Sequence, residues 1–318
     1  MEIIKNPRPA EIKKAANALK DGHLVAFPTE TVYGLGADAT NEKAVARIYD
    51  VKARPTNHPL IVHVSSINLI ENWSKEIPKY AIKLAKEFWP GPMTLVLPRT
   101  DLAKNFITGG QSSIGIRVPS HPIALSLLKH FESLGGLGVT APSANRFGAV
   151  SPTSSASTME EIGSYLSNMD LILDGGNCVI GLESTIIGCL EEEPVILRPG
   201  IISNSMIAQV TGLKIQEINS GLIVKSSGQF KSHYAPRARV VLDVKPEPGD
   251  GFLALADIQT PEGTIRLGAP GDVNQYAKIL YAALRDGDKK NLRRIVAILP
   301  NGSGLALAIR DRLVKSSG

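Results

Sequence analysis

Apolar residues recur along the chain at two spacings, and each spacing predicts one kind of element. A repeat of three to four residues, typical of amphipathic helices, predicts most of the helices. They span 9–20, 42–52, 81–88, 122–131 and 160–166, and later 274–285 and 305–314. Pro9 suits the first turn of the first helix and Gly22 its end.

Short apolar or alternating runs, many ended by proline or glycine, predict the strands. In the first part of the chain they span 24–27, 60–64, 94–97, 114–118, 138–140 and 171–174. The runs 185–189 and 194–197 predict a hairpin around an acidic turn. A second series follows at 239–244, 252–256 and 295–299.

These elements predict two domains and a connection. Residues 1–212 mix helices with alternating and continuous strands, which indicates an α/β domain with a mixed sheet. The pattern weakens over 213–238, the predicted linker. Strand–helix–strand order over 239–318 predicts a small, largely parallel, doubly wound domain. Residues 141–158 are rich in Ser, Pro, Ala and Thr, yet strands resume on both sides, so we assign them to the first domain.

Composition and charge narrow the classes of protein. The chain has 318 residues, 43% of them hydrophobic and 20% charged, as in an ordinary globular protein. A net charge of +5 fits anionic partners such as nucleotides or RNA. No apolar run approaches the roughly 20 residues that span a bilayer, and we expect a cytoplasmic protein. Cys178 and Cys189 form no Cys-x-x-Cys pair, so we expect buried thiols and no zinc site.

The most informative stretch begins at Phe27 and ends at Val64. A buried strand stops at Pro28, and three polar residues, an aromatic and two glycines follow. One helix later come Lys52 and Arg54, which we interpret as exposed ligands of an anion, most simply a phosphate. The alternative is an ordinary turn and a solvated helix end assisted by the helix dipole.

The common nucleotide-binding motifs are absent from the sequence. There is no G-x-x-x-x-G-K-[ST], and Gly34-Leu-Gly36 lacks the third glycine of a dinucleotide fingerprint. If ATP binds, side-chain cations and hydroxyls must hold its triphosphate.

Several separated motifs together resemble the Sua5/YrdC family of threonylcarbamoyl-AMP synthases. They are the two segments above with Ser143-Ala-Asn145, Arg198-Pro-Gly200 and His233-Tyr-Ala-Pro236. The resemblance covers nearly the whole chain and includes the extra domain of the Sua5 branch. It implies a YrdC-like mixed, twisted sheet with helices and a smaller Rossmann-like α/β C-terminal Sua5 domain.

The resemblance implies an ATP site. Its residues would be Lys52, Arg54, His58, Ser113, Ser143, Asn145, Ser151, Arg198 and Tyr234, with Lys52, Arg54, Ser143 and Asn145 catalytic. From the residues alone, Ser143 and Asn145 could equally cap a helix. The family commonly has Asn where this chain has His58, and Asn57 precedes it. In the Sua5 branch the segment 231–236 folds over the active site as a lid.

The resemblance also implies a threonine site formed by Thr31, His63, Arg117, Ala141 and Ser184. Arg117 lies inside an apolar strand, where a charge needs a partner, so it either pairs structurally or binds a ligand carboxylate. A lone histidine in a strand, such as His63, is otherwise typical of core packing.

The implied reaction converts L-threonine, bicarbonate or carbon dioxide, and ATP into threonylcarbamoyl-AMP and pyrophosphate. Mg²⁺ would bridge the ATP phosphates. The product would pass to a threonylcarbamoyl transferase complex that modifies adenosine 37 of tRNAs, and a weak contact with tRNA or double-stranded RNA is compatible with the basic charge.

The sequence leaves two other classes of protein as alternatives. An RNA-binding protein would fit the basic charge, but the chain lacks an RNP-like aromatic motif and an extended Lys/Arg stripe. A carbamoyl-adenylate enzyme of hydrogenase maturation would carry acylphosphatase-like and zinc-finger modules, and neither is visible in the sequence.

Overall fold

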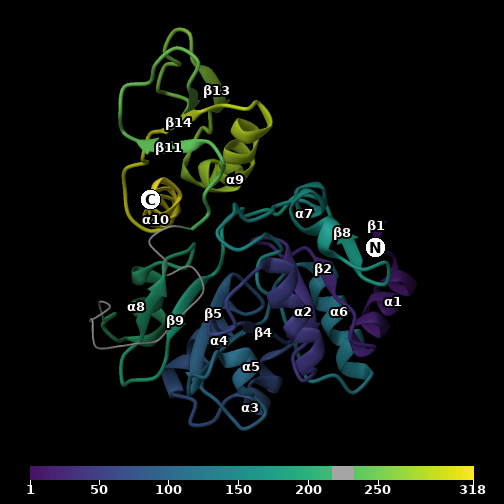
Figure 1. The fold of residues 1–318 in the computed structure, drawn as a ribbon. Coiled ribbons are helices and arrows are strands. Elements are labelled where there is room, and N and C mark those ends of the chain that lie inside the picture. The colour runs from purple at the N-terminus through teal and green to yellow at the C-terminus, as the bar shows by residue number, and fades with distance from the viewer. Residues whose placement is uncertain (217–232) are drawn as a thin grey trace.

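A mixed sheet forms the centre of the first domain in the computed structural model, which describes residues 1–216 and 233–318 (Figure 1). Within residues 1–216 its ten strands lie in the order β1 (Glu2–Lys5), β8 (Leu171–Asp174), β2 (Val25–Phe27), β3 (Gly34–Asp38), β7 (Val139–Thr140), β4 (Ile61–His63), β6 (Ser113–Arg117), β5 (Met93–Pro98), β9 (Thr185–Gly188) and β10 (Val195–Arg198). Strands β4 and β6 run parallel, and β5 runs antiparallel to β6. The prediction of a mixed sheet is confirmed.

Helices cover both faces of this sheet, because alternate residues of its strands are apolar on each side. Val25 and Phe27 of β2 pack against α1 (Pro9–Lys20) and α6 (Pro122–Ser133). Ala26, between them, packs on the other face against α2 (Glu42–Lys52). The remaining helices are α3 (Ile70–Trp73), α4 (Lys79–Phe88), α5 (Asn105–Thr108), α7 (Ser155–Ile162) and α8 (Asn204–Thr211), with 3-10 turns at Ile67–Leu69 and Gly163–Tyr165.

The helix that leads to the cations begins and ends at the predicted residues. Asn41 caps α2, its side chain accepting a hydrogen bond from Ala44 N at 3.1 Å. Ala53 ends the helix in the left-handed conformation, with φ of 48°. This turn redirects the chain between Lys52 and Arg54.

Two predictions in this domain are wrong. The helix expected over 160–166 begins earlier, at Ser155, because Ser154 caps it by accepting a hydrogen bond from Ser157 N at 3.1 Å. The two glycines expected in the polar loop after Pro28, Gly34 and Gly36, lie instead in strand β3 (Gly34–Asp38). Its Gly36 is required by packing, since a Cβ there would lie 2.8 Å from the Phe27 ring. Strand β1 and helix α8 were not predicted.

The C-terminal domain has a four-stranded parallel sheet. Within residues 233–318 the order is β11 (Arg239–Leu242), β14 (Arg294–Ala297), β12 (Gly251–Leu253) and β13 (Ile265–Gly268), of which β13 was not predicted. Helices α9 (Val273–Lys289) and α10 (Leu305–Ser317) both pack on the face that carries Ile295. The opposite face, with Val296, packs instead against loop residues such as Ile258. The doubly wound arrangement is therefore wrong, because both helices lie on one face.

Helices α9 and α10 lie between their own sheet and the first domain (Figure 1). Arg285 of α9 pairs with Glu161 at 2.8 Å, and Arg312 of α10 pairs with Glu183 at 2.9 Å. Most of the predicted linker, 217–232, lies outside the described residues, and the boundaries 1–212, 213–238 and 239–318 remain a prediction. No helix in the described part of the chain is long and apolar enough to cross a membrane.

Candidate active site

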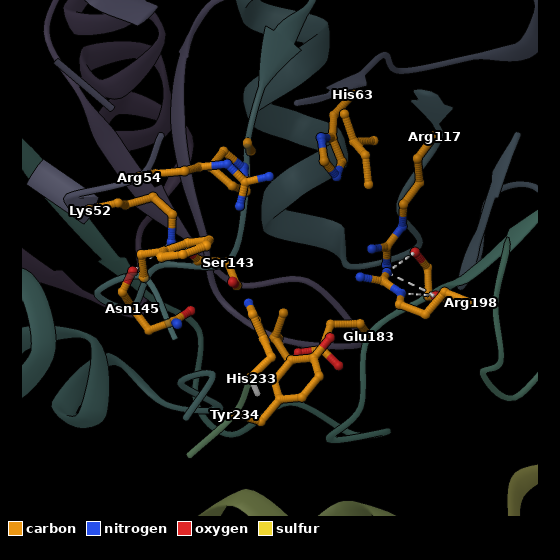
Figure 2. Close-up of a pocket in the computed structure, with 16 residues that line it drawn as sticks. Lys52, Arg54, His63, Arg117, Ser143, Asn145, Glu183, Arg198, His233 and Tyr234 are labelled. Atoms are coloured by element: carbon orange, nitrogen blue, oxygen red, sulfur yellow. Dashed lines mark hydrogen bonds between the residues drawn. The ribbon is translucent and has the colours of Figure 1, made fainter. Parts of the chain in front are cut away.

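One cavity collects most of the predicted site residues. It lies where the carboxyl ends of β4 and β6 meet the loop after β7, and its interior volume is about 50 Å³ (Figure 2). The predicted residues that line it are Lys52, Arg54, His63, Arg117, Ala141, Ser143, Asn145, Ser184, Arg198 and Tyr234. Lining residues that were not assigned include Ile61, Phe147, Glu183 and His233.

Lys52 is buried, with 2% of its surface exposed, so the expectation of an exposed cation is wrong. Its ammonium donates hydrogen bonds of 2.5 Å to the carbonyl oxygens of both Ser143 and Asn145. Burial, together with the nearby charge of Arg54, holds the pKa of Lys52 well below its usual range. Lys52 thus fixes the loop that carries the two polar residues, and the alternative of a solvated helix end is wrong.

Arg54 is also buried. Its guanidinium donates to Pro59 O at 3.0 Å and lies 5.9 Å from the centre of the Phe147 ring. Burial lowers the pKa of Arg54 to about 10. His58 packs against the other side of this region, with its ring 5.3 Å from that of Phe147.

Asn145 presents an unsatisfied oxygen. Its Nδ2 donates to Arg146 O and Ala149 O, both at 2.8 Å, which fixes the orientation of the amide. Its Oδ1 is buried and has no hydrogen-bond partner within the described ranges. Such an atom calls for a water, a ligand donor or a cation. The capping alternative for Ser143 and Asn145 is wrong, since Ser154 caps the next helix.

The far end of the cavity holds Arg117 and His63, at the ends of two paired strands. Arg117 donates to Glu30 Oε1 at 2.5 Å, so it has a structural partner while still lining the cavity. Burial, and next the Arg117 charge, lower the pKa of His63 to about 3, so its imidazole is neutral. Its Nδ1 has no hydrogen-bond partner among the described residues.

Glu183 is the main residue that sequence reasoning missed. Its carboxylate accepts from Ser151 Oγ at 2.6 Å, Tyr281 OH at 2.7 Å and Arg312 Nε at 2.9 Å. Burial alone would raise its pKa, but Arg312, Arg198 and the hydrogen bonds outweigh burial and lower it to about 2. No motif could have found it, because two of its partners come from the C-terminal domain.

The wall beside Glu183 is built from the segment before β11. His233 N donates to Lys315 O and Tyr234 O accepts from Ser316 Oγ, both at 3.0 Å. The Tyr234 ring stacks on that of Tyr281 with centres 5.6 Å apart. Helices α9 and α10 therefore hold this segment in place, and His233 and Tyr234 line the cavity (Figure 2). Lys231 lies outside the described residues.

Four predicted residues do not line the cavity. Thr31 lies behind Arg117 and accepts from its guanidinium at 2.9 Å, and Ser151 binds Glu183. His58 packs against Phe147. Ser113 begins β6. Because side chains alternate between the two faces of a strand, Ser113 lies on the same face as Arg117, and Gly115 lies between them on that face. Their roles in ligand binding remain predictions.

The electrostatics of the cavity favour a polyanion. Four cations line it, at Lys52, Arg54, Arg117 and Arg198, against the single carboxylate of Glu183 among the described lining residues. Arg198 is held by hydrogen bonds of 2.9 Å and 3.2 Å to Ser184 O and Oγ. Fixed cations in a buried site attract phosphates and need little reorganisation when charge develops.

The fold and the cavity define a two-domain α/β protein with a buried, cationic binding site. A family model described as telomere recombination, for the Sua5, YciO and YrdC proteins, matches residues 17–200. A second, described as the C-terminal domain of threonylcarbamoyl-AMP synthase, matches residues 202–318. The chain belongs to the Sua5/YrdC family of threonylcarbamoyl-AMP synthases, in its two-domain Sua5 branch.

Individual relatives agree over the full length. Threonylcarbamoyl-AMP synthase of Pyrococcus abyssi is 39% identical over 341 residues, which covers 100% of this chain and 98% of that protein. The enzyme of Bacillus subtilis is 36% identical over 331 residues, covering 97% and 93%. The crystal structure of P. abyssi Sua5 complexed with L-threonine superposes with a TM-score of 0.88 at 36% identity, covering 100% of this chain and 97% of that one. The predicted family, the mixed sheet and the separate α/β C-terminal domain with a parallel sheet are confirmed.

Proposed function

We propose that this protein is a threonylcarbamoyl-AMP synthase that converts L-threonine, bicarbonate or carbon dioxide, and ATP into threonylcarbamoyl-AMP and pyrophosphate. The observation that carries the proposal is the convergence of four cations from three separate segments on one cavity: Lys52 with Arg54, Arg117, and Arg198. The names of the full-length relatives and the threonine complex of the P. abyssi protein support it.

The two ends of the cavity suit the two larger substrates. Arg117 would bind the threonine carboxylate, because a guanidinium matches a carboxylate in geometry and charge. Neutral His63 and the small Ala141 would surround the rest of the amino acid, with Ser184 beside them. ATP would occupy the end with Lys52, Arg54 and the 143–145 loop, and Tyr234 and Arg198 would close over the nucleotide.

The chemistry needs no nucleophilic side chain. The free amine of threonine forms a C–N bond to the carbon of carbon dioxide and loses a proton, which gives a carbamate. From bicarbonate the same carbamate forms when a C–O bond breaks and water leaves. A carbamate oxygen then attacks the α-phosphorus of ATP, and the bond from that phosphorus to the bridging oxygen breaks to release pyrophosphate. Positioning the two substrates can lower such a barrier by about 7–11 kcal/mol, and the fixed cations stabilise the charge that develops on the phosphates.

Mg²⁺ is part of the proposal as the ion carried by ATP. The described residues contain no group of three or more His, Cys, Asp or Glu side chains placed to hold a metal. The unsatisfied Oδ1 of Asn145 and the Ser143 hydroxyl fit an ion whose other ligands are phosphates and water. Bound there, Mg²⁺ would supply charge neutralisation on the phosphates.

The proposed product is an activated threonylcarbamoyl group, which a transferase complex must consume. We assign that consumer to the modification of adenosine 37 in tRNA, and the proposal places both steps in the cytoplasm, where ATP and threonine are available. The net charge of +5 supports only a weak, salt-sensitive contact with tRNA or double-stranded RNA.

The test is pyrophosphate release from ATP with threonine and bicarbonate each omitted in turn. We expect release only in the complete mixture, with threonylcarbamoyl-AMP identified by mass spectrometry. Release without threonine would contradict the proposal. No release in any mixture, together with salt-dependent RNA binding on filters, would favour an RNA-binding protein instead.

A further inference from the structure

We propose that Glu30 is a positioning residue that fixes the Arg117 guanidinium in the orientation needed to bind the threonine carboxylate. The inference rests on the proposed function and extends it to a residue to which the sequence motifs assigned no role. It comes from the contacts that the two side chains make behind the cavity wall.

The first observation is a buried ion pair in which both carboxylate oxygens are used. Arg117 Nη2 donates to Glu30 Oε1 at 2.5 Å, and Ser120 N donates to Glu30 Oε2 at 3.0 Å. The two side chains are only 6% and 5% exposed. Because one oxygen is anchored to the backbone, the other presents a fixed acceptor to the guanidinium.

The second observation is that the remaining contacts leave one side of the guanidinium for a ligand. Nη2 also donates to Thr31 Oγ1 at 2.9 Å, and Nε donates to Gly91 O at 3.3 Å. Within the described ranges Nη1 makes no hydrogen bond, and Arg117 lines the cavity (Figure 2). Glu30, Thr31 and Gly91 therefore hold the group from behind while Nη1 remains available.

The third observation concerns the direction of the hydroxyl hydrogen bonds behind Arg117. Thr29 Oγ1 donates its proton to Val32 O at 2.6 Å. In the 2.8 Å contact between Thr29 and Thr31, the proton must then come from Thr31. Thr31 thus has no proton left for a ligand, and its role is to accept from Arg117.

Position 30 requires a carboxylate because each of the two side-chain oxygens must accept a hydrogen bond. A glutamine oxygen that accepts from Arg117 places the NH₂ group against Ser120 N–H. In the opposite orientation the oxygen accepts from Ser120 N–H and the NH₂ group faces the Arg117 guanidinium. In both orientations two hydrogen-bond donors face each other. Glu30→Gln should therefore release the guanidinium while barely changing the volume of the side chain.

The experiment is calorimetric titration of L-threonine into the full-length protein, with separate KM values for threonine and ATP in the pyrophosphate assay. For Glu30→Gln we expect threonine affinity to fall about tenfold or more, the range for a hydrogen bond to a charged group. We expect the KM for ATP to stay within about twofold, because the proposed ATP site lies at the other end of the cavity. A defect in folding alone would move both KM values or the active fraction.

Asp170→Asn is the matched control. Asp170 is a buried carboxylate that also accepts from an arginine, Arg47 Nη2 at 2.6 Å, and from a backbone amide, Leu24 N at 2.8 Å. It does not line the cavity. The control is expected to lose stability and to keep its affinity for threonine.

Thr31→Val gives a second test that removes one contact with little change of shape. We expect threonine affinity to fall about threefold or more, with the KM for ATP again unchanged. If Glu30→Gln fails to fold, an unchanged threonine affinity in Thr31→Val overturns the inference. If Glu30→Gln folds and binds threonine like the wild type, the inference fails while the proposed function stands. If the wild-type protein neither binds threonine nor needs it to release pyrophosphate, the proposed function fails as well.

Discussion

Arg312 Nε lies 2.9 Å from Oε2 of Glu183, so a residue of the last helix completes a wall of the cavity 129 positions away in sequence. The two side chains are 0% and 7% exposed. The same guanidinium donates to Pro199 O at 3.0 Å, next to Arg198, and lies 5.3 Å from the centre of the Tyr234 ring. The C-terminal domain thus supports Glu183, the backbone next to Arg198, and Tyr234 through one side chain.

Arg312→Met should lower the free energy of unfolding by about 3–5 kcal/mol, because it leaves the Glu183 carboxylate buried without its ionic partner. Urea unfolding followed by circular dichroism measures this change. Arg310→Met is the control on the same helix, since among residues 1–216 and 233–318 Arg310 binds only the carbonyl oxygens of Pro300 and Gly302. Equal losses in the two variants would contradict a special role for the pair.

Lys52→Met should lower kcat by about 10²–10³-fold, the usual effect of removing one fixed donor from a charge-stabilising site. It should also cost about 1–3 kcal/mol of stability, because Ser143 O and Asn145 O lose their donor. Pyrophosphate release at saturating ATP measures the rate. Lys43→Met, exposed on the same helix, is the control. A Lys52→Met enzyme with full turnover would remove Lys52 from the catalytic machinery.

Tyr234→Phe tests whether the phenol faces the nucleotide. Its hydroxyl is buried and has no partner among residues 1–216 and 233–318, so its removal should leave stability nearly unchanged. We expect the KM for ATP to rise about threefold or more. Tyr276→Phe is the control, as its hydroxyl donates to Ile298 O at 3.0 Å outside the cavity. An unchanged KM for ATP would show that the Tyr234 hydroxyl does not bind the nucleotide.

Tyr234→Ala removes the whole ring that α9 and α10 hold against the cavity. If this segment excludes water, the variant should release more pyrophosphate per threonylcarbamoyl-AMP retained, because the intermediates would hydrolyse. The ratio of the two products, measured in one reaction by mass spectrometry and a pyrophosphate assay, checks the prediction. A ratio equal to that of the wild type would argue against a covering role.

The stability of the fold should depend on pH through two buried histidines. Burial is the main cause that lowers the pKa of both His63 and His233 to about 3, from an ordinary value of 6.5. Below pH 6.5 the unfolded chain therefore binds protons that the folded chain does not. The stabilisation is present above pH 6.5 and is lost as the pH falls toward 3.

Urea unfolding between pH 7.5 and 4 measures how steeply the free energy of unfolding changes with pH. A double variant, His63→Gln with His233→Gln, should show a shallower fall in the free energy of unfolding over this range. His23→Gln, in the turn after α1 and outside the cavity, serves as control. If the double variant keeps the wild-type slope, other groups control the acid sensitivity.

Local signals in the sequence placed several elements at their observed bounds. The capped, periodic segment ending at Lys52 is one, because Asn41 supplies the cap and Ala53 the end without help from distant residues. The Ser- and Thr-rich run before Ile162 misled the prediction, since Ser154 starts a helix there. Gly34–Asp38 misled it as well, because its pairing with β2 and β7 is a tertiary contact.

The site residues also fall into those that the sequence predicted and those that only tertiary contacts reveal. Lys52, Arg54, Arg117 and Ser143 were found by residue type and motif, and the cavity brings all four together. Their burial could not be foreseen, because it depends on loops that fold over them. Glu30 and Glu183 could not be assigned from the sequence either, since a carboxylate gains its role only from the partners placed against it.

The sequence by itself determined the alternating helices and strands, the separate C-terminal domain and the identity of the cations, because these depend on residue type and on periodicity along the chain. Only the tertiary structure decided which acids neutralise those cations and which groups remain open to a ligand. Partners such as Glu183 and Arg312 meet only after two domains have packed, and that contact has no signature in the spacing of residues.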